Sequence, residues 1–561
     1  DEQLCKSYLL KFLLLTYETR NYEGKSFFAY RLHQFISGAG TLFTTLESPD
    51  KRQCDLSGQV FLPGSDKTKR LFPTYFCRNC GQELHPVWER SDENRFEPRS
   101  IDERSFDEDD DSYAFLMPDP NCVWKDAILE NSIPEFWIDP DKPDEIKNHY
   151  RGELPSIVFV APDGRMQADG LRCVVIRGTF KFCPSCGIVY DRGKDALKLP
   201  GLSGEGRSSA TTIISLNALR YLMDENVSLD NKARKLLGFT DNRQDASLQA
   251  GHFNDFMQML LLRSALLAAI TQSPENYLRD DTIAHAVFHA LRFHTDDLSI
   301  RAEYLQQPAV LHGVNRMRAE EAMRKVLGHR LYADLQRGWR YNSPNLEQLG
   351  LLYIEYEGLD DLCRDELWQN AHHRLQSALP EVRRRLLTII FNDMRRKLCL
   401  QTSYLNELSK EQIKAQSANY LKEPWGIFDE NDISSARVML VGAKPKKLKA
   451  DSLVEVLSIR SKAGTQLKSA FTWNDSSIKF TTEEFNRIVN DLIRVAFEQG
   501  YLNKVEIDKN INGYQLKSDL LLWKRRFPED NKKYGDDRYA VSNPFFRSLY
   551  SSVADFLSQG S

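Results

Sequence analysis

Apolar residues recur along this chain with two different periods, one typical of helices and one typical of strands. Helical spacing dominates from residue 208 onward. The predicted helices cover residues 208–223, 246–270 and 481–499, with a mainly helical stretch over residues 275–430. The 481–499 helix has the clearest start, because Thr481 can cap it and the acidic Glu483 and Glu484 suit its first turn.

Short apolar runs bounded by turn residues predict strands. These runs are Ile157–Val160, Cys173–Ile176, Lys235–Phe239 and Val438–Val441, together with a β-rich stretch over residues 55–90 that includes Gln59–Leu62 and Tyr75-Phe76. Two further strands, Leu502–Ile507 and Gly513–Leu516, suggest a hairpin around Asn512-Gly513. A helix followed by such a hairpin is the winged-helix pattern. Because the 481–499 helix is mostly acidic, packing or strand splitting is favoured over base readout.

With 561 residues the chain is too long for one ordinary domain. The predicted fold class is α/β plus mainly α: a β-rich module, a partial α/β domain, and a helical insertion with a winged-helix-like subdomain. The predicted regions are a helical and turn-rich segment 1–54, the β-rich module 55–200, the α/β part 201–275, the helical domain 276–430, the winged-helix-like domain 431–530, and a C-terminal segment 531–561 that leads back to the α/β part.

Charge and hydropathy limit the function classes. Lys and Arg number 75 against 79 Asp and Glu, for a net charge of -4, which excludes a uniformly basic coat but not a local basic groove. The most apolar run, Met257–Ile270, contains Gln258 and Arg263 and is shorter than a bilayer requires. The chain starts without Met or a signal-peptide pattern. We expect a soluble, cytoplasmic piece of a longer or processed protein that makes no use of a membrane.

Residues 91–111 form an acidic stretch, with ten Asp or Glu against three Arg. A solvated loop is the plain interpretation. The sharper alternative is a mimic of nucleic-acid charge that docks on a basic groove.

Four of the ten cysteines form two matching pairs, Cys77-Arg-Asn-Cys80-Gly81 and Cys183-Pro-Ser-Cys186-Gly187. Two residues between thiolates let both sulfurs reach one ion, and the following Gly allows a tight turn. We therefore predict that Cys77, Cys80, Cys183 and Cys186 hold a structural Zn²⁺. The 102 residues between Cys80 and Cys183 far exceed the usual spacing, so the site must close across an inserted segment. Redox pairs, and His85 as a substitute ligand, are the alternatives.

Catalytic signatures are absent from the sequence. It contains no Gly-x-x-x-x-Gly-Lys-Ser/Thr loop, no Gly-x-Ser-x-Gly elbow and no His-Glu-x-x-His helix. The turn Thr240–Asp245 has more promise, since it would lie between a strand and a helix, where open α/β sheets bind ligands. Arg243 and Gln244 could contact a phosphate there; a charged capping turn is the equally weighted alternative.

Basic residues gather in several short segments. Arg383–Arg385 and Arg395–Lys397 are predicted to share one helix with a basic exposed side, and Lys444–Lys449 and Trp523–Arg526 are similar clusters. Each cluster alone is typical of a solvated face. Together they suggest a basic track for a phosphate backbone. The candidate nucleic-acid contacts are Arg243, Gln244, Arg384, Arg385, Lys446, Lys447 and Arg525.

The stretch Lys235-Leu-Leu-Gly-Phe-Thr-Asp-Asn-Arg-Gln-Asp-Ala-Ser247 resembles the first strand and motif IV of the second RecA-like domain of large bacterial superfamily 2 DEAD/DEAH-box helicases. The similar proteins are those associated with a DUF1998 zinc domain, including MrfA-like repair helicases and the helicases of the Druantia and DISARM phage-defence systems. Further stretches that fit this resemblance are residues 31–40, 76–83, 204–212 and 543–550.

The resemblance implies a parent protein that couples ATP hydrolysis, with ATP and Mg²⁺, to movement on DNA. The Walker A and B motifs would precede Asp1 and motif VI would follow Ser561, so the chain is expected to be inactive as an enzyme by itself. The resemblance assigns a nucleic-acid or interdomain role to Arg243 and Gln244, and zinc ligation to the four cysteines. The alternative is a scaffold that recruits a partner subunit of a defence or repair complex.

Overall fold

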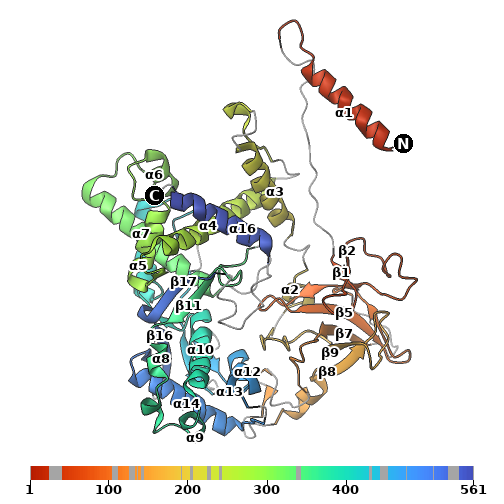
Figure 1. Ribbon diagram of the computed structural model, residues 1–561, viewed down its shortest axis with the longest axis vertical. Helices are drawn as coiled ribbons and strands as arrows, with labels where there is room; N and C mark the ends of the chain where they lie inside the picture. Colours follow the sequence, from red (N-terminus) through yellow and green to blue (C-terminus); the bar gives the residue numbers. More distant parts are fainter. Residues whose placement is uncertain are drawn as a thin grey trace. The chain divides into compact units, whose positions relative to one another are not determined.

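The computed structural model describes most of the chain (Figure 1). The described residues are 2–24, 41–103, 112–125, 133–134, 137–139, 145–190, 193–201, 206–223, 229–238, 243–336, 343–428, 433–442, 453–475, 477–509, 511–527 and 543–559. The chain divides into two units, Asp1–Gly38 and Ala39–Ser561. The first unit holds one helix, α1 (Glu2–Glu18).

Residues 41–201 form an antiparallel β module, as the sequence predicts for most of this range. Its larger sheet has the order β4-β5-β7-β9-β8, with β6 paired to β5, and a small sheet has the order β2-β1-β3. The strands are β1 (Phe43–Thr44), β2 (Cys54–Asp55), β3 (Phe72–Pro73), β4 (Tyr75–Phe76), β5 (Glu83–Arg90), β6 (Arg95–Pro98), β7 (Ser112–Pro118), β8 (Ser156–Val160) and β9 (Leu171–Arg177). The short helices are η3 (Asn148–Glu153) and α2 (Asp195–Lys198).

The two central strands of this sheet are buried on both faces. In β9, Val174 and Ile176 belong to one hydrophobic cluster, while Cys173 and Val175 belong to another. Successive side chains point to opposite faces of a strand, so a strand covered on both sides is a continuous apolar run. This explains why Cys173–Ile176 was recognisable as a strand from its sequence.

Two predictions inside the module need correction. Gln59–Leu62 forms no strand, only a single bridge between Phe61 and Arg70. The acidic stretch is not uniformly a loop either, because β6 pairs with β5 and Glu97 forms ion pairs with Arg70 and Arg90. The most acidic part, residues 104–111, lies outside the described residues.

Residues 206–559 form a second body, and most of its described buried apolar residues belong to one large hydrophobic cluster. The sequence regions predicted as 201–275, 276–430, 431–530 and 531–561 all contribute to it. Its longer helices are α3 (Gly206–Met223), α4 (Arg243–Gln272), α5 (Asp280–Ala290), α6 (Leu298–Tyr304), α7 (Gly313–Leu335), α10 (Pro380–Arg396), α11 (Glu407–Tyr420), α14 (Thr482–Glu498) and α16 (Pro544–Gln559). The short helices are η4 (Asn231–Ala233), α8 (Leu359–Leu362), η5 (Asp365–Trp368), α9 (His373–Gln376), α12 (Lys462–Leu467), α13 (Ala470–Trp473) and η6 (Ser518–Leu520).

Two sheets pack among these helices. One has the order β10-β17-β11, and the other has the order β12-β16-β13-β14 with β15 paired to β16. Their strands are β10 (Tyr277–Leu278), β11 (Leu352–Tyr356), β12 (Leu400–Gln401), β13 (Val438–Val441), β14 (Val454–Leu457), β15 (Leu502–Asp508), β16 (Ile511–Lys517) and β17 (Leu521–Arg525). The 275–430 stretch is therefore mainly helical, as predicted, but it also supplies three strands.

Helix α4 is long and apolar enough to cross a membrane by length and composition, but 67% of its most apolar window is buried inside the protein. The buried residues run from Phe256 to Ile270 and include Arg263, whose guanidinium is paired with Asp334 in the core. The apolar composition and the burial of α4 are those of a helix in the core of the protein.

The helix and hairpin predicted near the C-terminus are present. Thr481 caps α14 by accepting a hydrogen bond from the Glu484 amide at 3.1 Å, and β15 pairs with β16. The turn, however, follows Asp508, and Asn512 and Gly513 lie within β16. A Cβ on Gly513 would lie 2.3 Å from Val438 Cγ1, so this glycine serves the close packing of β13 and not a turn.

The strand predicted over Lys235–Phe239 is not found. Residues 234–238 have no regular structure, and Leu236 and Leu237 are 45% and 73% exposed. No strand of the described residues pairs with this run, so its apolar side chains have no sheet to join. Thr240, Asp241 and Asn242 lie outside the described residues, and Arg243 opens α4.

Candidate metal centre

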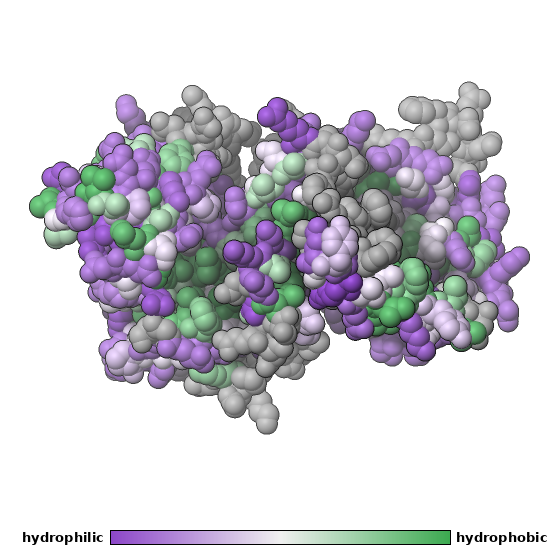
Figure 2. All heavy atoms as spheres, turned by 90° about the horizontal axis from the view of Figure 1, so that it is seen from above, coloured by the Kyte–Doolittle hydropathy of each residue, from purple (hydrophilic) through white to green (hydrophobic). Residues whose placement is uncertain are grey.

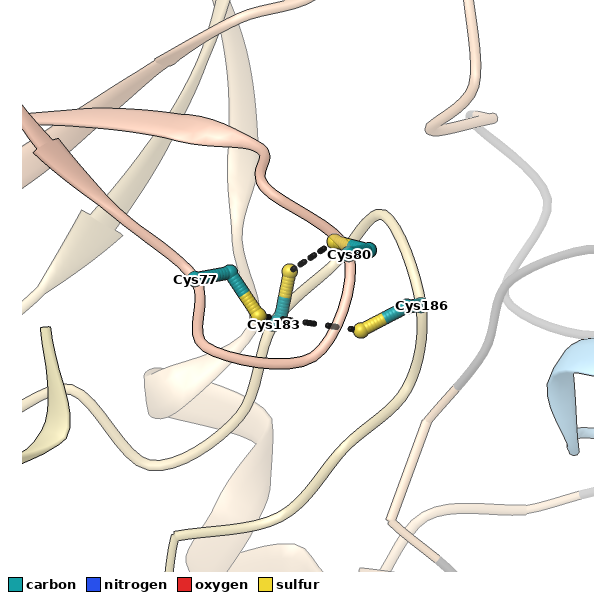
Figure 3. A group of neighbouring side chains, drawn as sticks. All are labelled: Cys77, Cys80, Cys183 and Cys186. Carbon is teal, nitrogen blue, oxygen red and sulfur yellow. Dashed lines mark hydrogen bonds between the residues drawn. The ribbon is translucent and has the colours of Figure 1, made fainter. Parts of the chain in front are cut away.

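The four paired cysteines converge at one end of the β module (Figure 3). The first pair lies in the turn between β4 and β5, and the second pair follows β9. The 102 intervening residues include strands β5 to β9 of the module, and the pairing of these strands brings the two turns together. The long spacing therefore reflects a complete sheet between the two halves of the site.

Both turns have the same backbone geometry. The amide of Cys77 donates to Gln82 O at 2.9 Å and that of Gly81 to Cys77 O at 2.9 Å. In the second turn, Cys183 N donates to Ile188 O at 3.0 Å and Gly187 N to Cys183 O at 2.8 Å. Gly81 and Gly187 have φ of 74° and 72°, a left-handed conformation that favours glycine. Each turn thus presents two sulfurs to the same side.

The distances between the sulfurs match a tetrahedral site. Cys77 Sγ lies 3.8 Å from Cys186 Sγ, and Cys80 Sγ lies 3.8 Å from Cys183 Sγ. All four sulfurs lie within 4.8 Å of one another. A tetrahedron with its corners about 2.3 Å from a central Zn²⁺ has edges of about 3.8 Å. A disulfide needs an S–S distance of about 2.05 Å, and none of the four cysteines is disulfide-bonded in this structure.

Burial and hydrogen bonds complete the site. Cys77, Cys183 and Cys186 are buried, and Cys80 is half-buried. The pKa of Cys77 is lowered, chiefly by its hydrogen bond with Cys183, while that of Cys183 is raised, chiefly by its hydrogen bond with Cys186. Because metal ligation needs thiolates, a bound metal would displace the protons of these thiols.

Two residues beyond the cysteines support the cluster. Asn79 Nδ2 donates to Cys186 Sγ at 3.4 Å, and the Tyr190 hydroxyl lies 3.3 Å from Cys77 Sγ. Such contacts orient the ligands and spread the negative charge of thiolates. Neither residue was predicted from the sequence, although each lies within four residues of a ligand cysteine, and this closeness is the signal that could have found them.

His85 is not a ligand. It lies in β5, fully buried, with Nδ1 3.3 Å from Pro73 O, and burial lowers its pKa to about 4. The residues present fit a Cys₄ metal site such as a zinc site. Four thiolates around one ion would leave no open position for a substrate, which is the arrangement of structural zinc sites.

The predicted nucleic-acid contacts fall into three groups. Arg243 and Gln244 are exposed in the first turn of α4, and their side chains form no hydrogen bond or ion pair with other described residues. Arg384, Arg385 and Arg525 have partners inside the protein. Lys446 and Lys447 lie outside the described residues.

The internal partners of the second group are well defined. Arg384 pairs with Glu355 at 3.6 Å and Asp360 at 3.0 Å. Arg385 donates to Phe471 O at 3.1 Å and Asn474 Oδ1 at 3.0 Å. Arg525 donates to Thr271 Oγ1 at 2.8 Å. These contacts tie elements of the body together, so DNA contact by these three residues stays a prediction.

The expectation of a continuous basic side on α10 is wrong. Arg383 and Arg395 are buried: Arg383 donates to Leu375 O at 2.8 Å and pairs with Asp365, and Arg395 pairs with Glu347 at 2.7 Å. Charged residues with several buried partners can occupy a helix face that a simple pattern assigns to solvent.

No protein-family model matches this chain, and searches of curated proteins and of solved structures found no match either.

Proposed function

We propose that this chain is a non-catalytic central portion of an ATP-dependent DNA helicase or translocase, in which it contributes zinc-stabilised structure and nucleic-acid contacts, with antiphage defence as one setting. Exposed Arg243 and Gln244 at the start of the 30-residue helix α4 carry the proposal. Backbone amides at a helix N-terminus and a guanidinium without a partner among the described residues suit a phosphate.

Two further features support this reading. The residues that resemble motif IV are the same ones that stand exposed at the start of α4. Helix α14 followed by the β15–β16 hairpin has the chain order of a winged helix, a module common in nucleic-acid enzymes. In this proposal residues 201–275 belong to a RecA-like domain, and ATP and Mg²⁺ act in the parent protein.

DNA binding by the full chain tests the proposal. Fluorescence anisotropy with single- and double-stranded DNA should show binding that weakens as salt increases, with no ATP hydrolysis. Arg243→Ala should weaken binding to all DNA sequences similarly. It should also reduce the slope of the logarithm of the binding constant against the logarithm of salt concentration by about one. Arg318→Ala is the matched control, because Arg318 is an exposed arginine on α7. Absence of DNA binding at low salt, or equal effects of both variants, would refute the proposal.

A protein-interaction scaffold is the second candidate, and helix α1 favours it. Its apolar side chains are exposed on all sides, with Tyr8 65%, Leu10 59% and Leu15 63% exposed. A helix that is apolar all round is normally buried against other protein. Elsewhere exposed apolar side chains form separate patches, as the face in Figure 2 shows.

A pull-down after nuclease treatment tests the scaffold. A stable partner subunit should be recovered by the wild type and lost with Leu10→Asp. Leu408→Asp, a change at a 79% exposed position of α11, should leave recovery unchanged. If the Leu10→Asp variant still recovers the partner, α1 is not the binding surface.

A further inference from the structure

A second group of metal-ligating side chains lies in the body, where α9 meets the start of α14. His372 and His373 begin α9, and Glu484 lies in the first turn of α14. One ligand atom from each residue lies within 4.8 Å of the others. The two imidazole rings have centroids 4.2 Å apart, and His372 Nε2 lies 4.0 Å from Glu484 Oε1. The fold thus brings together residues that are 111 and 112 positions apart in the sequence.

The surroundings hold these side chains in place. The His372 amide donates to Asp491 Oδ2 at 2.8 Å, which fixes the start of α9 against α14. Arg374 Nε donates to Glu484 Oε1 at 2.7 Å. Arg374 also lies over the Phe480 ring at 5.1 Å and donates to Lys479 O at 3.4 Å. Arg374 would therefore keep partners if Glu484 turned toward a cation.

We propose that His372, His373 and Glu484 bind a divalent transition-metal ion such as Zn²⁺ or Ni²⁺. Imidazole nitrogen suits these ions, and a carboxylate supplies an oxygen ligand and negative charge. His373 is exposed, so the ion can enter from solvent, and water can fill the remaining positions. The bound ion links α9 to α14. This inference is independent of the proposed function and of the four cysteines.

Metal binding fixes which nitrogen of His372 carries the proton and changes two hydrogen bonds. His372 Nδ1 accepts a hydrogen bond from the Arg374 amide at 3.4 Å. Ligation through Nε2 needs a lone pair on Nε2, so the imidazole proton must lie on Nδ1. The long contact from the Arg374 amide is then lost. Glu484 gives up its bond to Arg374 in exchange for the ion.

Calorimetric titration of Ni²⁺ into the full chain, with one zinc already bound per chain, tests the site. We expect one equivalent of Ni²⁺ to bind. His373→Ala and Glu484→Gln should each weaken it by at least the roughly 10–100-fold that loss of a ligand's supporting partner costs. Arg374→Ala should tighten it, because Glu484 is released from a competing cation. Each variant's zinc content and circular dichroism should equal those of the wild type.

His285→Ala is the matched control, since His285 lies in a separate histidine group with His289, at a ring distance of 4.4 Å. It should leave Ni²⁺ binding unchanged. Amide hydrogen exchange should slow in α9 and in the first turn of α14 when Ni²⁺ binds. The proposal is overturned if the wild type binds no Ni²⁺, if His373→Ala binds as the wild type does, or if His285→Ala abolishes binding.

Discussion

The β module and the helical body are stabilised by different means. In the module, two small hydrophobic clusters lie on opposite faces of one sheet, and the loops at one end converge on four sulfurs. In the body, one continuous cluster runs from α3 to α16, and its buried cations are neutralised by carboxylates such as Asp334 and Glu347. A small core gains more from an added cross-link than a large one does. Buried ion pairs occur in both parts, because the module buries Lys198 with Asp195.

The comparison predicts that the two parts depend differently on metal. A structural zinc site supplies folding free energy directly, about 10–16 kcal/mol in zinc-finger peptides. The body has no cysteine cluster of this kind among its described residues. Loss of metal should therefore unfold one part and leave the other intact.

Cys183→Ser should give the largest effect. With one of four sulfurs lost and the site open to water, the module should unfold at physiological temperature, while α5, α7 and α10 stay folded. Hydrogen exchange followed by mass spectrometry reads the two parts separately, and a chelator should act on the wild type in the same way. Cys54→Ser, at an exposed cysteine, is the control. Equal protection of the module in both variants would show that the sulfurs do not hold it.

Arg263→Met tests the buried charges of the body. Arg263 donates to Asp334 at 2.7 and 3.0 Å, to Pro344 O at 2.9 Å and to the Tyr550 hydroxyl at 2.8 Å. Removing it leaves a carboxylate in the core without its cation, which costs about 3–5 kcal/mol. Urea unfolding of the body measures the loss.

Arg487→Met is the control for that change. Arg487 pairs with Glu483 on the exposed side of α14, so its loss should cost at most about 0.5 kcal/mol. Equal costs for the two variants would mean that the body does not depend on its buried charges in the manner proposed.

His85 should make the stability of the β module depend on pH, by a mechanism other than metal binding. Burial lowers its pKa to about 4 from an ordinary value of 6.5. As pH falls from about 6.5 to 4, the unfolded chain binds a proton that the folded module does not, so stability falls by about 3 kcal/mol. In His85→Gln this decrease of the free energy of unfolding with falling pH should disappear. In His149→Gln, a change at an exposed histidine, it should remain. Unfolding at several pH values with excess zinc provides the measurement, and equal slopes would contradict the assignment.

The sequence predicted the features that depend on local chemistry. The cysteine turns were recognisable because thiol spacing and a following glycine are imposed by the metal geometry, and α14 was recognisable from its capping threonine and apolar face. It could not predict how the halves of the metal site meet, because that depends on the order β4-β5-β7-β9 of the sheet. Asn79 and Tyr190 lie close in sequence to ligand cysteines, but the sulfurs that they contact, those of Cys186 and Cys77, belong to the opposite turn.

Long-range pairing also explains the errors. Lys235–Gly238 has the composition of a strand, but no strand in the described part of the chain pairs with it, and pairing depends on a partner elsewhere in the fold. Arg383 and Arg395 looked like surface residues because their carboxylate partners lie 18 and 48 positions away. His372 and Glu484 came together only through the packing of α9 on α14.

The smallest expected effect concerns Gly513, where the hairpin prediction placed a turn. In β16, a Cβ at this position would lie 2.3 Å from Val438 Cγ1 and 2.9 Å from Met439 O. Gly513→Ala should therefore force β13 away from β16 and destabilise the body by about 1–3 kcal/mol. Gly251→Ala in α4 has open space around it and should stabilise by about 0.5–1 kcal/mol, because alanine favours a helix. Urea unfolding distinguishes the two signs. If Gly513→Ala leaves the free energy of unfolding unchanged, β13 and β16 can move apart without cost, and their close packing does not stabilise the body.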